Sequence, residues 1–254
     1  MKKYISILLL LSTVIFTYAN KYQANQGDGA TGLLGEKTRL GINFNPLLSW
    51  SRTPGIEADN KGVRMGFQFG LQLDYYFAKN YGLTTGLYFD YLGTNINYTL
   101  TQYDTSKPLP VLYETKTTNY LHKYTSQYIE LPIGIKLRTN EFKRITVYGE
   151  LGASMMVLVS ARGTLINDFD GVKKDQVKVY NTRVNVFDMA ASGGAGIEYN
   201  IAGKTSIVAG LVYKYAFLNH IKDDKFKNSI PATLSTASDP IYLNYLALRV
   251  GVLF

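Results

Sequence analysis

Apolar and polar residues alternate one by one through long segments of this chain, and this pattern limits the possible folds more than any other feature. In residues 63–77 one series is Met65, Phe67, Phe69, Leu71, Leu73, Tyr75 and Phe77, and the interleaved series is Arg64, Gly66, Gln68, Gly70, Gln72, Asp74 and Tyr76. Successive side chains of a β-strand point to opposite faces of a sheet. The pattern therefore predicts a strand with one apolar face and one polar face.

Eight segments show this alternation, and together they predict an all-β chain. They cover residues 37–50, 63–77, 81–98, 119–138, 142–160, 183–201, 204–218 and 240–254. Each apolar face is long enough for a tilted strand that crosses a membrane, which takes roughly 9–11 residues. The connections are alternately short and long, as in up-and-down barrels with short periplasmic turns and long extracellular loops. We therefore predict an eight-stranded antiparallel transmembrane β-barrel with both chain ends in the periplasm.

A soluble sandwich or lipocalin-like barrel also alternates, and the position of the charges separates it from a membrane barrel. A membrane barrel is apolar on its outer face and polar inside. Here one face is almost free of charge, and the other carries Arg39, Arg64, Lys136, Arg138, Lys214, Arg249, Asp74, Asp90, Glu130, Glu150, Asp188 and Glu198. Six bases balance six acids, as expected in a closed interior where an unpaired buried charge costs several kcal/mol.

We predict that these twelve residues form a charge network in the lumen, with glycines on the same face making room for the long side chains. The short turns place neighbouring strands together. They suggest that Glu150 pairs with Arg138 or Lys136, and that Glu198 pairs with Lys214 or Arg249. Within the fourth segment, Pro132 predicts a β-bulge, because proline cannot donate to a strand ladder.

The first residues predict that the chain is exported. Lys2 and Lys3 precede an apolar run over residues 4–16, and Ala19 offers a small residue for cleavage. The run is too short to cross roughly 30 Å of hydrocarbon, so residues 1–19 are predicted to be a cleaved signal peptide. Residues 20–36 contain four glycines and are predicted to be a flexible periplasmic leader, which leaves 37–254 as the barrel domain.

The composition agrees with export and narrows the possible partners. The chain has 21 Tyr and no Cys. It therefore has no cysteine for lipoprotein acylation, a disulfide or a thiolate metal site, and the tyrosines suit the interfaces of a membrane barrel. A net charge of +8 would favour nucleic acid in a cytosolic protein. In an exported chain it favours anionic lipopolysaccharide. We expect outer-membrane lipid and lipopolysaccharide as partners, with no nucleic acid, no metal and no cofactor.

Two stretches resemble known sequence signals. The last strand places Tyr242, Leu246, Leu248, Val250, Val252 and Phe254 on one face, and it resembles the terminal signal by which the barrel-assembly machinery recognises its clients. Residues 127–136, with Tyr128, Glu130 and Pro132, resemble a strand of the PorT-like "porin family" barrels of Bacteroidota. Residues 66–77 and 82–91 are similar to that family's second and third strands. The resemblance implies location in the bacterial outer membrane and, in one branch of the family, a part in type IX secretion.

These features favour a scaffold or binding component that acts through extracellular loops, as part of an envelope or secretion complex. Two alternatives remain open. A narrow diffusion porin is disfavoured because eight strands enclose a lumen that side chains fill. A lipid A-modifying enzyme would use His122, Ser126, His220 and Asp223 near the extracellular rim, and it would need one His within about 3 Å of its nucleophile. We expect no enzymatic activity.

Overall fold

The computed structural model describes residues 37–54, 58–103, 115–167, 177–178, 184–203, 205–221 and 240–254, and these form ten strands without a helix. The strands are β1 (Thr38–Arg52), β2 (Ala58–Asn60), β3 (Arg64–Ala78), β4 (Tyr81–Tyr103), β5 (Thr115–Arg138), β6 (Ile145–Asn167), β7 (Val177–Lys178), β8 (Phe187–Ala202), β9 (Thr205–Ala216) and β10 (Tyr242–Leu253). In the described parts of the chain, no helix has the length and apolar character needed to cross a membrane. The predicted signal peptide and leader lie outside the described residues.

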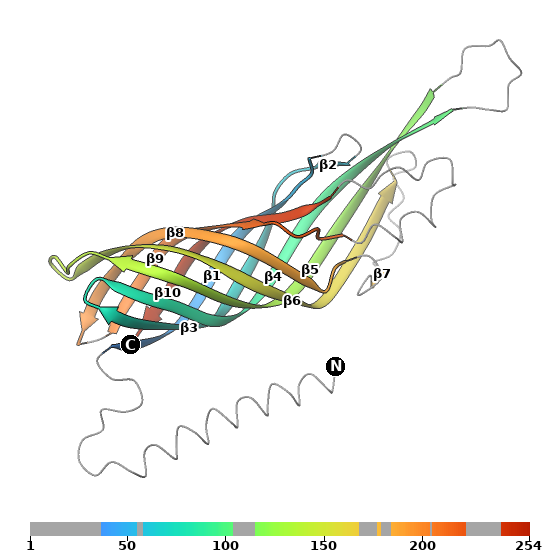
Figure 1. Cartoon of the computed structure of the whole chain (residues 1–254). Coiled ribbons are helices and arrows are strands. Elements are labelled where there is room, and N and C mark those ends of the chain that lie inside the picture. The colour runs from blue at the N-terminus through green and yellow to red at the C-terminus, as the bar shows by residue number, and fades with distance from the viewer. Residues whose placement is uncertain are drawn as a thin grey trace, which may run out of the picture.

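Eight of these strands form a closed antiparallel barrel (Figure 1). The strands follow one another in the order β4-β3-β1-β10-β9-β8-β6-β5, and β5 pairs with β4 to complete the ring. The first strand of the chain, β1, pairs with the last strand, β10. Leu40 and Phe254 exchange two backbone hydrogen bonds there, of 2.9 and 2.8 Å. The short strands β2 and β7 add to β4 and β6. The predicted eight-stranded fold is confirmed.

The strands differ in length, and three of them exceed their predicted bounds by at least four residues. Each of β4, β5 and β6 has 23 or 24 residues, whereas β9 and β10 have 12. The extra length lies at one end, where β4 and β5 run past the ring as a hairpin (Figure 1). Backbone pairing maintains this hairpin, with Tyr98 opposite Tyr120 and Thr101 opposite Thr117. The sequence there lacks an apolar alternation, which is why the predicted segments stop short.

The short turns gather at the opposite end of the barrel, together with the C-terminus (Figure 1). Lys79 and Asn80 join β3 to β4, and Gly203 turns the chain towards β9 in the left-handed conformation (φ 57°) that glycine adopts without strain. Residues 139–144 connect β5 to β6 and end with Lys143 and Arg144 at positive φ. In outer-membrane barrels, short turns normally face the periplasm and long loops face outside.

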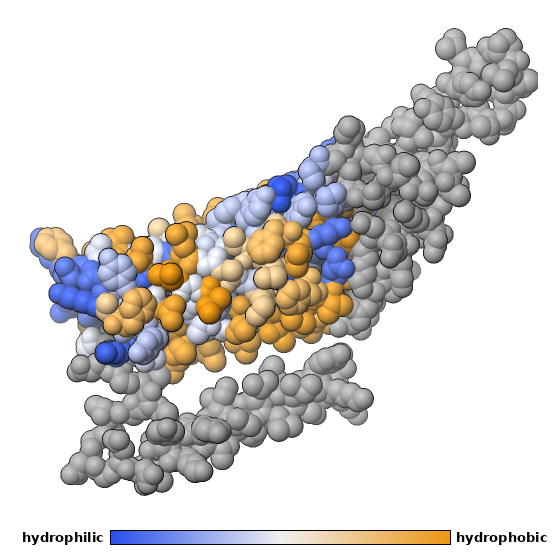
Figure 2. All heavy atoms as spheres, in the orientation of Figure 1, coloured by the Kyte–Doolittle hydropathy of each residue, from blue (hydrophilic) through white to orange (hydrophobic). Residues whose placement is uncertain are grey.

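The outer wall is apolar, as the sequence predicts. Leu71, Ile133, Leu211 and Leu248 lie among many exposed large apolar side chains on the barrel strands. In the space-filling view, hydrophobic residues cover much of the middle of the visible wall, and hydrophilic residues gather towards its ends (Figure 2). Apolar residues face outward and charged residues face inward, which is the arrangement of a membrane barrel.

The inner face has two parts, and only one of them is predicted from the sequence. The half nearest the turns holds most of the predicted charges. The half nearest the loops holds an apolar core that includes Leu92, Ile96, Tyr124, Met156 and Leu158. A signal for this core exists in the sequence. Residues 155–159 are five consecutive apolar residues, so β6 is apolar on both faces there.

The predicted bulge at Pro132 is wrong. Strand β5 pairs with β6 through Pro132 without a register shift, and the shift lies at Gln127 and Tyr128 instead. On the β4 side the pairing skips from Thr85 opposite Ile133 to Tyr88 opposite Glu130, in the same register. The Thr85 hydroxyl donates to the Pro132 carbonyl at 2.7 Å. The ladder therefore accommodates proline through a local gap with a side-chain hydrogen bond.

The depth of an outward-facing residue in the bilayer predicts how much a charged substitution there destabilises the barrel. Leu211 lies in the middle of β9 with 53% exposure, and Ile201 lies at the turn end of β8 with 47% exposure. We expect Leu211→Arg to lower the free energy of unfolding by about 2–4 kcal/mol and Ile201→Arg by about 0–1 kcal/mol, since burying the charge costs most at the bilayer midplane. Urea unfolding in lipid vesicles measures both. Equal losses would contradict the proposed membrane position of the wall.

Candidate functional site in the barrel lumen

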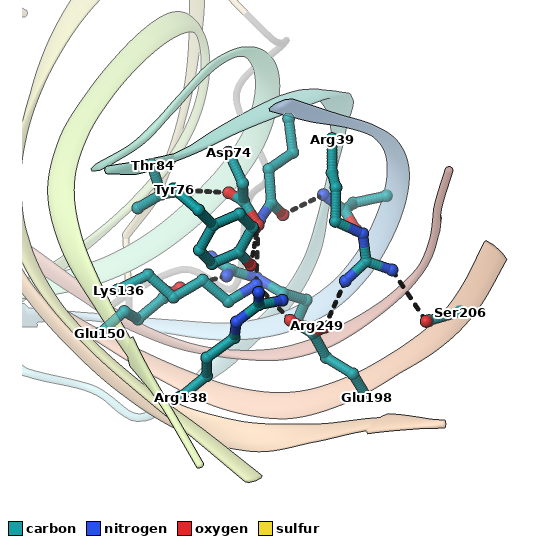
Figure 3. Close-up of polar contacts among 12 residues, drawn as sticks. Arg39, Asp74, Tyr76, Thr84, Lys136, Arg138, Glu150, Glu198, Ser206 and Arg249 are labelled. Atoms are coloured by element: carbon teal, nitrogen blue, oxygen red, sulfur yellow. Dashed lines mark hydrogen bonds and ion pairs between the residues drawn. The ribbon is translucent and has the colours of Figure 1, made fainter. Parts of the chain in front are cut away.

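A chain of alternating charges crosses the turn end of the lumen (Figure 3). Arg39 Nη1 lies 2.6 Å from Glu198 Oε2, and the other oxygen of Glu198 lies 2.6 Å from Lys136 Nζ. Lys136 Nζ also lies 2.8 Å from Asp74 Oδ2. The four side chains come from β1, β8, β5 and β3, so the ion pairs link opposite parts of the wall. Lys136 and Asp74 are fully buried.

The next layer of the lumen contains an ion pair and a tyrosine. Arg249 Nη1 of β10 lies 2.5 Å from Glu150 Oε2 of β6. Tyr148 lies against Gly196 and Gly210, where an added Cβ would come within 2.6 and 2.5 Å of the tyrosine hydroxyl oxygen. At these positions the glycines make room for an aromatic ring, whereas the sequence interpretation assigned the space to charged side chains.

A third polar cluster centres on Glu130 of β5. Lys214 of β9 forms an ion pair with one oxygen of Glu130. The other oxygen accepts hydrogen bonds from the Tyr245 hydroxyl at 2.7 Å and from Gln68 Nε2 at 3.0 Å. Gln68 Nε2 also donates to Asp90 Oδ1 at 2.7 Å. All five side chains are buried, so this cluster ties strands on both sides of the lumen together.

Arg64 and Arg138 lie outside these clusters, and the predicted balance of six bases and six acids is therefore absent from the buried lumen. Arg64 is half-buried towards the loop end and donates to the Tyr124 carbonyl at 2.7 Å. Arg138 lies at the turn end, where it donates to the Lys79 carbonyl at 3.1 Å and stacks on Tyr76 with 3.8 Å between the guanidinium carbon and the ring centroid.

Two of the six predicted acids have no basic partner within ion-pair distance among the described residues. Asp90 is bound by Gln68, and Asp188 Oδ1 accepts a hydrogen bond from the backbone N–H of Met189 at 2.8 Å. Both carboxyl groups are buried. The described lumen thus holds four bases, Arg39, Lys136, Lys214 and Arg249, beside six acids.

The ion-pair partners suggested by neighbouring strands are wrong. Glu150 pairs with Arg249, although the backbone register places Lys136 directly opposite Glu150. Glu198 pairs with Arg39 and Lys136, whereas the sequence suggested Lys214 or Arg249. Long side chains in a narrow lumen reach strands that are not adjacent in the sheet. Adjacency along the chain therefore does not determine the pairs.

The candidate enzyme residues at the loop end form a packed contact. Ser126 Oγ lies 3.4 Å from His220 Nε2, and the Tyr128 hydroxyl lies 2.9 Å from His220 Nδ1. His122 contacts the Tyr124 hydroxyl instead, at 3.2 Å. Burial lowers the pKa of His220 to about 4, so the imidazole is neutral near pH 7. Ser126 and His220 are each only 1% exposed, and a substrate does not reach them in this conformation. Asp223 lies outside the described residues.

A small cavity lies beside these groups. A cavity of about 30 Å³ is lined in part by Tyr88, Glu150, Lys214 and Arg249, close to the gap in the ladder at Pro132. This volume suits roughly two water molecules. Within the described part of the chain, no group of three or more His, Cys, Asp or Glu side chains is placed to hold a metal ion.

A closed barrel with an apolar wall and a charged, filled lumen defines the class of integral β-barrel membrane proteins. The chain matches the outer membrane protein beta-barrel domain family over residues 23–222. It therefore belongs to this family and is located in the bacterial outer membrane. A comparison with curated proteins found no match.

Solved structures with a similar fold come from several bacteria. Neisserial surface protein A is 10% identical, with 85% of this chain and 95% of that chain covered and a TM-score of 0.40. Ail of Yersinia pestis, in complex with the heparin analogue sucrose octasulfate, is 16% identical over 86% and 99% of the two chains, with a TM-score of 0.37. OprG of Pseudomonas aeruginosa is 11% identical over 86% and 96%, with a TM-score of 0.38.

The pair formed by Glu150 and Arg249 allows a test of the lumen. Glu150→Gln or Arg249→Met leaves one buried charge without its partner, and we expect each to lower the free energy of unfolding by about 3–5 kcal/mol. The double variant should recover much of this loss, because it removes both charges. Urea unfolding in lipid vesicles gives the three values.

Arg138 provides the control for this double-mutant cycle. It lies at the turn end and contacts Lys79 and Tyr76 rather than Glu150, so Arg138→Met and Glu150→Gln should be additive within about 0.5 kcal/mol. Additive losses for Glu150 and Arg249 as well would show that the two groups do not interact.

Proposed function

We propose that this outer-membrane barrel is a closed scaffold that binds partners through its extracellular loops and does not conduct solutes. The filled lumen is the observation that carries the proposal. Ion pairs bridge its turn end, and the apolar core occupies its loop end. A diffusing solute would have to separate buried ion pairs, which costs several kcal/mol for each charge left unpaired.

The long strands support a binding role outside the membrane. A crossing takes roughly 9–11 residues, and β4, β5 and β6 have more than twice that number. These strands continue past the ring and present a hairpin at the loop end (Figure 1). The resemblance of residues 127–136 to PorT-like barrels supports a further part of the proposal, that the partner is an envelope complex of the type IX secretion kind.

Conductance measurements test the closed lumen against the alternative of a narrow porin. We expect the purified full chain in a planar lipid bilayer to show no discrete openings in salt solution, since the ion pairs and the apolar core block the path. A known porin in the same lipid serves as the positive control. Discrete, reproducible openings that scale with salt concentration would replace the scaffold with the diffusion pore.

The outer face of the C-terminal strand supports the proposal that the barrel-assembly machinery recognises this strand. Leu246, Leu248, Val250, Val252 and Phe254 form an exposed stripe on the outer face of β10. Tyr242, the sixth residue of the predicted signal, is half-buried on the same face. This stripe meets the membrane along its whole length, and the side chain of Phe254 lies at the turn end, where the chain stops.

A charge at the terminal aromatic tests this recognition. Phe254→Asp should leave the protein in the periplasm and sharply reduce the folded barrel in the outer membrane, because the terminal apolar group is lost. Heat-modifiable migration of membrane fractions measures the folded amount. Phe77→Asp is the matched control, since Phe77 is also exposed at the turn end of a strand, and it should assemble. Normal assembly of Phe254→Asp would refute the assigned role of this residue.

A further inference from the structure

Arg52 is the one charged residue on the outward faces of three adjacent strands. The outward positions of β1, β10 and β9 otherwise carry apolar, aromatic or small polar residues along their full described length. Arg52 is the last residue of β1 and pairs in register with Tyr242, the first residue of β10. It therefore lies at the loop end of the wall, where the apolar surface meets the extracellular side.

Two tyrosine rings hold the guanidinium group of Arg52. Its central carbon lies 4.4 Å from the ring centroid of Tyr215 and 4.3 Å from that of Tyr242. Among the described residues, Nη2 has one long hydrogen bond, 3.5 Å to the carbonyl of Ala216, and Nε is buried without a hydrogen-bond partner. The two rings fix the cation in position, and the terminal nitrogens Nη1 and Nη2, rather than the buried Nε, are the donors left for a ligand.

A second aromatic pair lies beside this clamp. Trp50, two residues before Arg52 on the same face, stacks with Tyr213 at 6.1 Å between ring centroids and 23° between planes. Leu48, Leu246 and Leu211 continue the outward surface towards the middle of the wall. From the loop end inward, the surface therefore presents a cation, then aromatic faces, then aliphatic side chains.

We propose that this surface binds one lipid A headgroup of lipopolysaccharide in the outer leaflet. The planar guanidinium suits bidentate hydrogen bonds to a phosphate, and its position between two rings reduces the conformational entropy lost on binding. The exposed ring of Tyr213 and the half-buried ring of Trp50 beside it fit a sugar ring. The aliphatic stripe fits the acyl chains below it.

The order of these groups favours a phosphorylated glycolipid over an ordinary phospholipid. A phospholipid would use the cation and the aliphatic stripe but would leave the aromatic faces between them unused. Charge complementarity also fits, because no acidic side chain occupies the outward positions of β1, β9 and β10. The inference rests on location in the outer membrane and is independent of whether the lumen conducts.

Trp50 is the only tryptophan of the chain, so its fluorescence reports on this surface. The folded full chain in zwitterionic detergent is titrated with bisphosphorylated lipid A, and the emission change gives an apparent dissociation constant. We expect saturable binding that Arg52→Gln weakens by about 10-fold or more, as for the loss of a charge-assisted hydrogen bond. The affinity of Arg52→Lys should lie between those of the wild type and Arg52→Gln, because lysine keeps the charge without the planar guanidinium.

Three controls separate binding at this site from a general electrostatic attraction of lipid A to the basic protein. Lys79→Gln removes an exposed charge at the turn end and should bind as the wild type does. Tyr215→Leu keeps the cation but removes one ring, and it should weaken binding. It also provides an independent variant if Arg52→Gln does not fold, which heat-modifiable migration shows. Phosphatidylglycerol and inorganic phosphate should compete poorly with lipid A.

The outcomes that overturn the proposal are equally specific. Wild-type affinity in Arg52→Gln would mean that the cation does not bind the headgroup. Equal weakening by Lys79→Gln would indicate a response to net charge. Equal affinity for phosphatidylglycerol would indicate an unspecific anionic lipid contact. None of these outcomes bears on the conductance test, so failure of the lipid A site and failure of the closed scaffold are distinguishable.

Discussion

The absence of hydrogen-bonding partners in hydrocarbon is the constraint on which the rest of this structure depends. Every backbone N–H and C=O in the membrane must find a partner within the protein, and a closed sheet provides one. The ring closes where β4 meets β5, and β1 meets β10 through the bonds between Leu40 and Phe254. The gap at Pro132 shows the same requirement locally, because the Thr85 hydroxyl satisfies a carbonyl that the ladder leaves unpaired.

Closure turns half of the side chains into a confined interior, and that interior must be filled. In the turn half it is filled by charges that neutralise each other across the lumen, such as Lys136 between Asp74 and Glu198. In the loop half it is filled by apolar side chains around Tyr124 and Met156. A buried charge without a partner is costly, and the ion pairs that offset this cost cross-link strands that share no backbone hydrogen bonds. The lumen is thereby a structural core as well as the interior of a barrel.

Alternation was enough to predict the eight strands, their outward faces and the burial of Glu130, Lys136 and Lys214, because side-chain direction in a strand has period two. Partners could not be predicted in the same way. Glu150 lies beside Lys136 in the sheet and yet pairs with Arg249, because the reach of long side chains across the lumen decides the contact. Residues 155–159 signal the apolar core. Alternation treated as uniform along each strand does not predict this core, because β6 is apolar on both faces over part of its length.

A filled lumen leaves the outer surface of the barrel as the place where a ligand can bind. Two arginines that stack on tyrosine rings, Arg138 and Arg52, illustrate how position matters there. Arg138 stacks on Tyr76 at the turn end and donates from Nε to the Lys79 carbonyl. Arg52 is held by two rings at the loop end, and among the described residues its Nη2 has one long hydrogen bond, to the Ala216 carbonyl. The two side chains therefore differ in position rather than in the number of these bonds. Arg138 lies at the turn end, whereas Arg52 lies on the outward face at the loop end, which is the position that the proposed headgroup site requires.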